Sequence, residues 1–181
     1  LEQRLNLPDG TRVLLVHEPP DGGVARYVMH LALGLGEHGF QVEVAGPRAS
    51  NIADPLRAAG IEVHTTSLTR SYSRPDQDTR ATVEIGRILR SRRISIVHSH
   101  SSKAGVLARI AARAARLPSI YSPHCFGFVG DVGRPRELAA RTIETALARV
   151  TDAIVCVSEA ERRRALELRI APSGRLHTVL Q

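Results

Sequence analysis

Short apolar runs alternate with longer amphipathic segments along the whole chain. The short runs hold four or five residues each, as in Val13-Leu14-Leu15-Val16. The longer segments repeat apolar residues every three to four positions, which is the period of a helix that buries one face. The pattern predicts strands at residues 13–16, 41–45, 61–65, 94–97, 119–123, 153–157 and 176–180, and helices at residues 24–37, 52–59, 78–93, 106–117, 135–150 and 159–168.

Most of the predicted strands are apolar throughout, which is typical of a parallel sheet covered by helices on both faces. We therefore expect an α/β fold with a doubly wound parallel sheet of about seven strands, forming one domain over residues 1–181. No repeat, low-complexity tract or linker interrupts this pattern. Because residues 179–181 read as the middle of a strand, we expect the chain to be cut from a longer protein.

Helix 106–117 shows the pattern most clearly. We expect its apolar stripe (Val106, Ile110, Ala114 and Leu117) to face the core, and its basic residues (Arg109, Arg113 and Arg116) to lie together on another face. In helix 78–93 we expect Val83 to point inward. Ser158 is the expected N-cap of the last helix.

Four loops begin at the carboxyl ends of predicted strands, where open parallel sheets collect their ligands. They are residues 18–23, 98–105, 124–133 and 158–159, and each carries polar residues or glycine. The first ends in Gly22-Gly23 at a helix start, where free N–H groups and the helix dipole favour an anion or a polar ligand. An ordinary turn, in which the glycines only permit tight geometry, is the alternative.

Composition excludes several classes of protein. No segment approaches the roughly 18 consecutive apolar residues of a membrane span, and two cysteines in 181 residues do not make a disulfide scaffold. The net charge of +7 would suit nucleic acid, anionic lipid or phosphorylated substrates. With only 3% aromatic residues and no recognition motif, we expect no nucleic-acid binding. We expect a cytoplasmic protein.

Two cofactor motifs are absent. Gly22-Gly23 is followed by Val24, Ala25 and Arg26, so the dinucleotide fingerprint G-x-G-x-x-G is missing, and no acidic residue ends the second strand. The phosphate-binding sequence G-x-x-x-x-G-K-[ST] is missing as well. We expect neither NAD nor P-loop chemistry.

A zinc site is a further hypothesis, because His98, His100, His124 and Cys125 are zinc-ligating residue types. We expect His98 and His100 to point to opposite sides of the strand end, so that both reach one metal only on an irregular backbone. No compact second pair of ligands accompanies them. We therefore expect no metal, and instead one buried, hydrogen-bonded histidine and one loop histidine.

Ser101-Ser102-Lys103 allows two interpretations. The group combines a nucleophile with a base, but no G-x-S-x-G elbow or S-x-x-K spacing is present. Alternatively, Ser101 or Ser102 caps the next helix while Lys103 faces an anionic ligand.

Four motifs together resemble the N-terminal half of a family 4 glycosyltransferase. They are D-G-G-V-A-R-Y at residues 21–27, H-S-H-S-S-K-A-G at 98–105, S-P-H-C-F at 122–126 and C-V-S-E-A-E at 156–161. The resemblance implies a GT-B architecture of two Rossmann-like domains that face a cleft. Residues 1–181 would form the N-terminal, acceptor-side domain, and the C-terminal nucleotide-sugar domain would be absent from this chain.

The resemblance also implies roles for particular residues. His124 would point into the cleft, contact the donor sugar and act as the catalytic residue. Gly22, Gly23 and Val24 would lie against the donor diphosphate and the acceptor. The remaining residues expected to bind donor or acceptor are His100, Ser101, Ser102, Lys103, Ser158 and Glu159.

The implied activity is transfer of a sugar, with retention, from a nucleotide-sugar to a lipid, polysaccharide or small-molecule acceptor. It needs no metal or other cofactor, and the isolated domain would be inactive. Such enzymes serve bacterial cell-envelope polysaccharide biosynthesis in the cytoplasm. The arginines of the helices at residues 78–93 and 106–117 would contact anionic lipid at the inner face of the plasma membrane, or simply form a solvated surface: Arg87, Arg90, Arg92, Arg93, Arg109, Arg113 and Arg116.

Cys125 departs from the family, which usually has glycine after the histidine, and its side chain would narrow the approach to the donor. Acceptor specificity is expected in residues 68–76 and 126–134. The competing hypothesis is a non-catalytic sugar- or nucleotide-binding module of the same fold, since fold alone does not define function.

Overall fold

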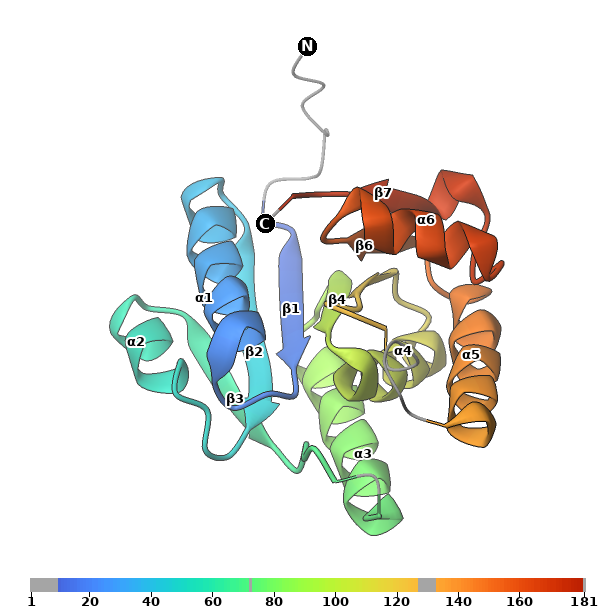
Figure 1. Ribbon diagram of the computed structural model, residues 1–181. Coiled ribbons are helices and arrows are strands. Elements are labelled where there is room, and N and C mark those ends of the chain that lie inside the picture. The colour runs from blue at the N-terminus through green and yellow to red at the C-terminus, as the bar shows by residue number, and fades with distance from the viewer. Residues whose placement is uncertain (1–9, 72, 127–132, 181) are drawn as a thin grey trace.

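A single seven-stranded sheet runs through the computed structural model, which describes residues 10–71, 73–126 and 133–180 (Figure 1). All neighbouring strands are parallel, in the order β3-β2-β1-β4-β5-β6-β7. The strands are β1 (Arg12–His17), β2 (Gln41–Pro47), β3 (Glu62–Thr66), β4 (Ile96–His100), β5 (Ser119–Ser122), β6 (Ala153–Cys156) and β7 (Leu176–Thr178). The predicted fold class, a doubly wound parallel sheet, is confirmed.

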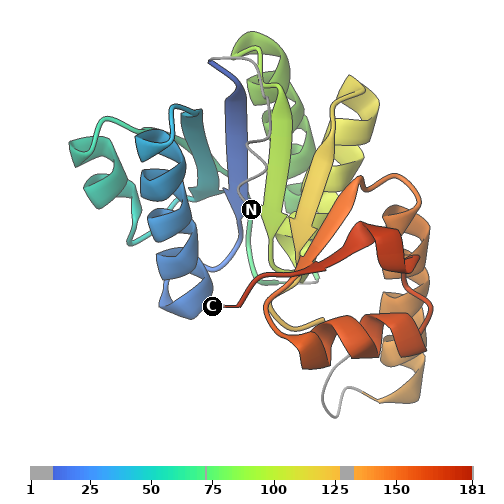
Figure 2. The same ribbon diagram turned by 90° about the horizontal axis from the view of Figure 1, so that it is seen from above.

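Helices connect the strands and cover both faces of the sheet. They are α1 (Gly22–Glu37), α2 (Ala53–Ala58), α3 (Pro75–Ser91), α4 (Ser102–Ala115), α5 (Arg134–Ala148), α6 (Glu159–Glu167) and the short 3-10 helix η1 (Ser173–Arg175). Figure 2 shows α1 and α2 on one side of the sheet and α3 and α4 on the other. No described helix is long and apolar enough to cross a membrane.

Strand β1 contributes side chains to the core on both faces of the sheet. Val13 and Leu15 pack with α1 and α2, whereas Leu14 and Val16 pack with α3 and α4. A third cluster joins β5, β6 and β7 to α5 and α6 around Tyr121. An apolar strand is therefore needed at β1, because successive side chains enter opposite layers of the core.

Three element boundaries matter for the site. Helix α1 begins at Gly22 and α4 at Ser102, so the glycine pair and the Ser-Lys sequence lie in first turns of helices. Strand β4 extends to His100, three residues beyond the predicted end. His98 and His100 lie on the same face of β4, with ring centroids 4.1 Å apart. The expectation that they point to opposite sides is wrong, because residues two apart in a strand share a face.

The predicted inward faces of α3 and α4 are partly wrong. Val83 and Ile110 are each 44% exposed, and the buried face of α4 is built mainly from alanines (Ala104, Ala108, Ala111 and Ala112). Small residues are needed there because α4 packs against both the sheet and α3.

Arg109 is fully buried rather than part of a basic surface. Its guanidinium donates to the carboxylate of Glu144 on α5 at 2.8 Å and lies 3.9 Å from the ring centroid of Tyr121. The Tyr121 hydroxyl donates to the same carboxylate at 2.9 Å. Burial, and then the Glu144 charge, raise the pKa of Tyr121 well above its ordinary value, so this phenol stays a donor. The three side chains join α4, α5 and β5.

Candidate functional site

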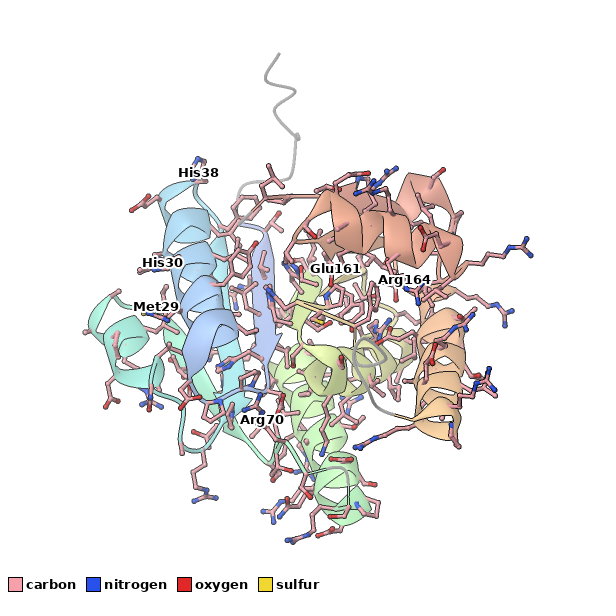
Figure 3. The ribbon with its side chains drawn as sticks, viewed as in Figure 1. Met29, His30, His38, Arg70, Glu161 and Arg164 are labelled. Atoms are coloured by element: carbon pink, nitrogen blue, oxygen red, sulfur yellow. The ribbon has the colours of Figure 1, made fainter. Side chains whose placement is uncertain are left out.

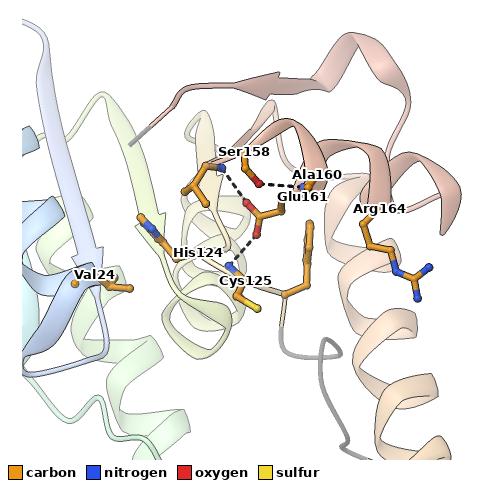
Figure 4. A pocket seen from close by; sticks show the side chains of 10 residues that line it. Val24, His124, Cys125, Ser158, Ala160, Glu161 and Arg164 are labelled. Atoms are coloured by element: carbon orange, nitrogen blue, oxygen red, sulfur yellow. Dashed lines mark hydrogen bonds between the residues drawn. The ribbon is translucent and has the colours of Figure 1, made fainter.

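The order of the strands along the chain reverses between β1 and β4, and polar residues meet at the carboxyl ends of these strands and of β5. The parallel register places His17 beside His100, and His100 beside Ser122. Beyond this row lies a cavity of about 490 Å³ (Figure 4). It is lined by Gly23, Val24, His124, Cys125, Phe126, Val157, Ser158, Ala160, Glu161 and Arg164. These residues come from α1, the segment after β5 and the start of α6.

The start of α1 supplies backbone donors. Gly22 has a φ of 80°, which glycine adopts without strain. No side chain caps this helix, because Asp21 makes no hydrogen bond from the N-cap position, and the first turn holds no acidic residue. The first N–H groups of a helix have no partner within the helix and carry the positive end of its dipole. This end of the cavity therefore favours an anion.

The start of α6 has the opposite character. Ser158 accepts from the N–H of Glu161 at 3.1 Å, which confirms the predicted N-cap. The Glu161 carboxylate accepts from the N–H groups of Val157 at 2.9 Å and Cys125 at 2.8 Å. Glu159 adds a second carboxylate, and it accepts from Thr178 and Arg162. Because the Ser158 hydroxyl caps this helix and two carboxylates lie in its first turn, it suits a neutral polar ligand better than an anion.

His124 lines the cavity in a fixed position. Its Nε2 lies 3.0 Å from Nδ1 of His100, and its ring meets the ring of Tyr27 edge-on at 5.0 Å between centroids. Its own φ is 51°, a left-handed conformation that turns the chain sharply after β5. The contacts with His100 and Tyr27 therefore fix the orientation of the His124 ring in the cavity.

Three histidines lie beneath His124 and are neutral at pH 7. Burial lowers the pKa of His98 to about 3, and burial followed by the charges of His98 and His124 lowers that of His100 well below its usual range. Burial also lowers the pKa of His17, although the Pro19 carbonyl opposes this. His98 Nε2 lies 2.9 Å from Ser122 Oγ. The sequence predicted one buried histidine here, whereas three are buried: His17, His98 and His100.

The contacts of Ser101 and Lys103 match neither the nucleophile-and-base interpretation nor the interpretation as a helix cap with a ligand-binding lysine. Ser101 is the N-cap of α4, with a φ of 77°, but its side chain caps no N–H group of that helix. Its hydroxyl lies 3.5 Å from Glu18, and burial raises the pKa of Glu18 although Arg70 and Lys103 oppose the shift. Lys103 is 5% exposed, with its ammonium 2.7 Å from the Asp78 carboxylate. Its charge therefore has a partner within the protein.

The described residues contain no group of three or more histidine, cysteine or acidic side chains placed to hold a metal ion. The expected specificity segments fall partly outside the description, since residues 72 and 127–132 are not described. Of the expected site residues, Gly23, Val24, His124 and Ser158 line the cavity, whereas His100 lies behind His124.

Four residues that line the cavity were not among the expected binding residues: Val157, Ala160, Glu161 and Arg164. Glu161 stands three positions after Ser158, and this S-x-x-E spacing is the signature of a capping box that could have identified it. Arg164 follows one helical turn after Ala160 on the cavity side and is half exposed (Figures 3 and 4). Phe126, the first residue of the expected specificity segment 126–134, lines the cavity and is buried.

The strand order and the helices on both faces of the sheet define a Rossmann-like domain, with its cavity beside the point where the strand order reverses. The chain belongs to the glycosyl transferase 4-like domain family, whose model matches residues 22–180, and so is the N-terminal domain of a family 4 glycosyltransferase. The resemblance drawn from its four motifs is thereby confirmed.

Relatives and solved structures agree with this family. Over 119 residues the chain is 29% identical to UDP-Gal:alpha-D-GlcNAc-diphosphoundecaprenol alpha-1,3-galactosyltransferase of Escherichia coli. This match covers 65% of this chain and 30% of that protein. A glycosyltransferase from Rickettsia africae superposes with a TM-score of 0.75 at 15% identity, covering 96% of this chain and 43% of the other. Anabaena HepE in complex with UDP and glucose gives 0.72 at 14%, with 94% and 44% covered. The chain thus spans less than half of each of these proteins.

Proposed function

We propose that this chain is the acceptor-side half of a retaining glycosyltransferase, which moves a sugar from a nucleotide-sugar to a lipid, polysaccharide or small-molecule acceptor. The observation that carries the proposal is the cavity in which the uncapped start of α1, His124 and the capped start of α6 meet. The E. coli relative, by its name, uses UDP-galactose and a diphosphoundecaprenol acceptor, and HepE holds UDP and glucose. Both support a nucleotide-sugar as the donor.

The chemistry of glycosyl transfer fits the two ends of the cavity. Negative charge develops on the leaving diphosphate, and the N–H groups of Gly23 and Val24 stabilise it without moving. Arg164 also lines the cavity, on the α6 side, but its guanidinium donates to Glu167 at 3.3 Å. His124, as a neutral imidazole, forms a hydrogen bond to a sugar hydroxyl. We assign the stabilisation of the leaving diphosphate to the start of α1 and propose no metal or other cofactor.

The proposal leaves most of the nucleotide to a second domain. This chain covers only 43% of the Rickettsia glycosyltransferase, and the described cavity holds the carboxylate of Glu161 but no carboxylate pair of the glycosidase type. We therefore expect the 181-residue chain alone to bind weakly and to transfer nothing.

The test uses the longer protein that carries this chain. A panel of nucleotide-sugars is assayed for transfer and hydrolysis, and the anomeric configuration of the product is read by NMR. We expect turnover of one donor with retention, and a loss of about 100-fold or more in His124→Ala if this side chain stabilises the transition state. His30→Ala is the matched control, because His30 lies exposed on the outer side of α1 (Figure 3).

Two results would contradict the proposal. Inversion at the anomeric carbon would remove the retaining mechanism. Nucleotide binding by calorimetry without turnover of any donor would favour the non-catalytic binding module instead.

A basic surface on α3 and α4 is a proposed contact with anionic membrane, at the cytoplasmic face where a lipid-linked acceptor would be met. Arg109 does not belong to it, because it is buried against Glu144. The exposed arginines are Arg87, Arg90, Arg93, Arg113 and Arg116, with Arg92 at the edge paired to Glu43. Each basic residue near an anionic surface contributes about 1 kcal/mol. Vesicle sedimentation should show stronger binding to anionic than to neutral lipid, lost in high salt; equal binding to both would dismiss the contact.

A further inference from the structure

The positions of the two rings do not say which of His100 and His124 donates the hydrogen bond between them. Nδ1 of His100 and Nε2 of His124 lie 3.0 Å apart. Two neutral imidazoles share one proton across such a contact, so one ring donates and the other accepts. We propose that His100 is the donor and acts as a positioning residue, which holds His124 in the tautomer with its proton on Nδ1. The activity readout of this inference rests on the proposed function.

The burial of His100 selects the donor. His100 is 0% exposed, and its Nε2 has no hydrogen-bond partner among the described residues. If His124 donated, His100 would carry its proton on Nε2, as a buried N–H group without an acceptor. A buried donor without an acceptor loses its hydrogen bonds to water and gains none in the protein, so this arrangement is unfavourable. With the proton on Nδ1, His100 donates to His124 and leaves only a bare lone pair buried.

The alternative of a charged pair is excluded by the surroundings of His100. The rings that face it are those of His98, His124 and Tyr27, and His17 lies beside it on the paired strand β1. None of these side chains is a carboxylate, so none of them stabilises an imidazolium at this depth. A neutral His100 is the state in which the contact forms.

The strand geometry keeps the two rings in place. His100 is the last residue of β4, and His98 beside it is held by Ser122 of β5 through a 2.9 Å contact. His124 follows Ser122 by two residues, and its left-handed backbone brings its ring over His100. The contact therefore lies at the carboxyl ends of β4 and β5 and is held by the sheet.

The consequence for the site is a fixed polarity of His124. Its Nε2 is occupied as an acceptor, so the imidazole that lines the cavity has a single N–H, at Nδ1. It cannot accept from a hydroxyl through Nε2. A ligand group bound through the ring N–H of His124 is therefore a hydrogen-bond acceptor, such as a sugar oxygen or a phosphate oxygen.

The first test needs no variant and no substrate. Nitrogen-15 spectra of the histidine side chains in the 181-residue chain at pH 7.5 separate proton-bearing from lone-pair ring nitrogens. We expect the proton of His124 on Nδ1 and that of His100 on Nδ1 as well. A His124 ring with its proton on Nε2, or with an even mixture of tautomers, would overturn the inference.

Two substitutions at His100 then separate hydrogen bonding from packing. The side-chain amide of His100→Asn places an N–H near the position of Nδ1, so His124 should keep its tautomer. The apolar ring of His100→Phe removes the donor, and both tautomers of His124 should appear. Ser122→Ala is the matched control, because it removes the partner of His98 and leaves the His100 contact intact. An unchanged His124 tautomer in His100→Phe would contradict the positioning role.

Activity of the longer protein gives the last readout. His100→Phe should lower kcat about tenfold, as loss of one oriented hydrogen bond predicts, with KM changed less and with most of the loss restored in His100→Asn. A folded His100→Phe with full kcat would overturn the role in catalysis. If the tautomers are as expected but the wild-type protein turns over no donor, the proposed function fails and the tautomer assignment stands.

Discussion

His124 and Cys125 are consecutive non-glycine residues with positive φ, at 51° and 88°. Left-handed backbone costs most L-amino acids about 1–2 kcal/mol, because the Cβ atom approaches the carbonyl oxygen. The structure retains this conformation at Cys125 even though the side chain is not glycine. The amide of Cys125 explains why, since it donates to Glu161 and fixes the backbone.

Relief of this strain is a direct prediction. Cys125→Gly should raise the free energy of unfolding by up to about 1 kcal/mol, because glycine adopts positive φ freely, although it also gains entropy when unfolded. Urea denaturation of the 181-residue chain measures the change. Cys125→Ala is the control that removes the thiol and keeps the Cβ atom. Equal stabilities of the two variants would show that no backbone strain is stored at this position.

Helix α4 shows how closely one element is fitted to its neighbours. A Cβ atom at Gly105 would overlap the ring of Tyr121, which is itself held between Arg109 and Glu144. We predict that Gly105→Ala lowers the free energy of unfolding by about 1–3 kcal/mol, the range for overpacking. In Gly34→Ala on α1 the added methyl group meets nothing within 4 Å, so this change should stabilise by about 0.5–1 kcal/mol. Thermal unfolding of both variants tests the contrast, and a destabilised Gly34→Ala would weaken the packing argument.

The buried ion pair between α4 and α5 gives a second prediction for this element. Arg109→Leu leaves the Glu144 carboxylate, 5% exposed, without its cation, and should cost about 3–5 kcal/mol. The double variant Arg109→Leu with Glu144→Leu should recover much of this loss, since no charge then remains buried. Urea midpoints of wild type, the single and the double variant form the comparison. A double variant less stable than the single one would mean that the pair itself stabilises the fold.

The elements whose burial follows from apolar pattern alone were predictable, and those with neighbours on several sides were not. Strand β1 is apolar because both faces are covered, so its position and the fold class could be predicted. The face of α4 could not, because its core contacts are alanines, a glycine and a charged residue. Arg109 reads as a surface residue until Glu144, 35 positions away, is placed beside it. Of the cavity, the α1 glycines and His124 carried sequence signals, whereas Arg164 depends on the position of α6.

At the scale of the whole molecule, the buried histidines make the fold sensitive to acid. The pKa values of His17, His98 and His100 are lowered by burial, so the unfolded chain, with values near 6.5, binds these protons more readily. Stability is therefore complete above about pH 6.5 and is lost as the pH falls below it.

We predict a loss of about 1.4 kcal/mol for His98 and again for His100 between pH 7.5 and pH 5.5, with His17 adding to the loss in the same direction. Urea unfolding at both pH values measures this difference. His98→Gln removes one titrating group, so its loss should be smaller by about 1.4 kcal/mol. Identical pH dependence in wild type and variant would show that His98 does not titrate on unfolding.

The Glu161 carboxylate has a consequence for recombining such domains. It accepts hydrogen bonds from the backbone N–H groups of residues 125 and 157, and neither bond depends on the side chain at those positions. Segments grafted after residue 125 from other transferases should therefore seat on the same anchor, whatever their sequence, with proline at 125 as the exception because it has no N–H. Libraries that vary the segment after residue 125 should therefore keep Glu161 and Ser158 unchanged.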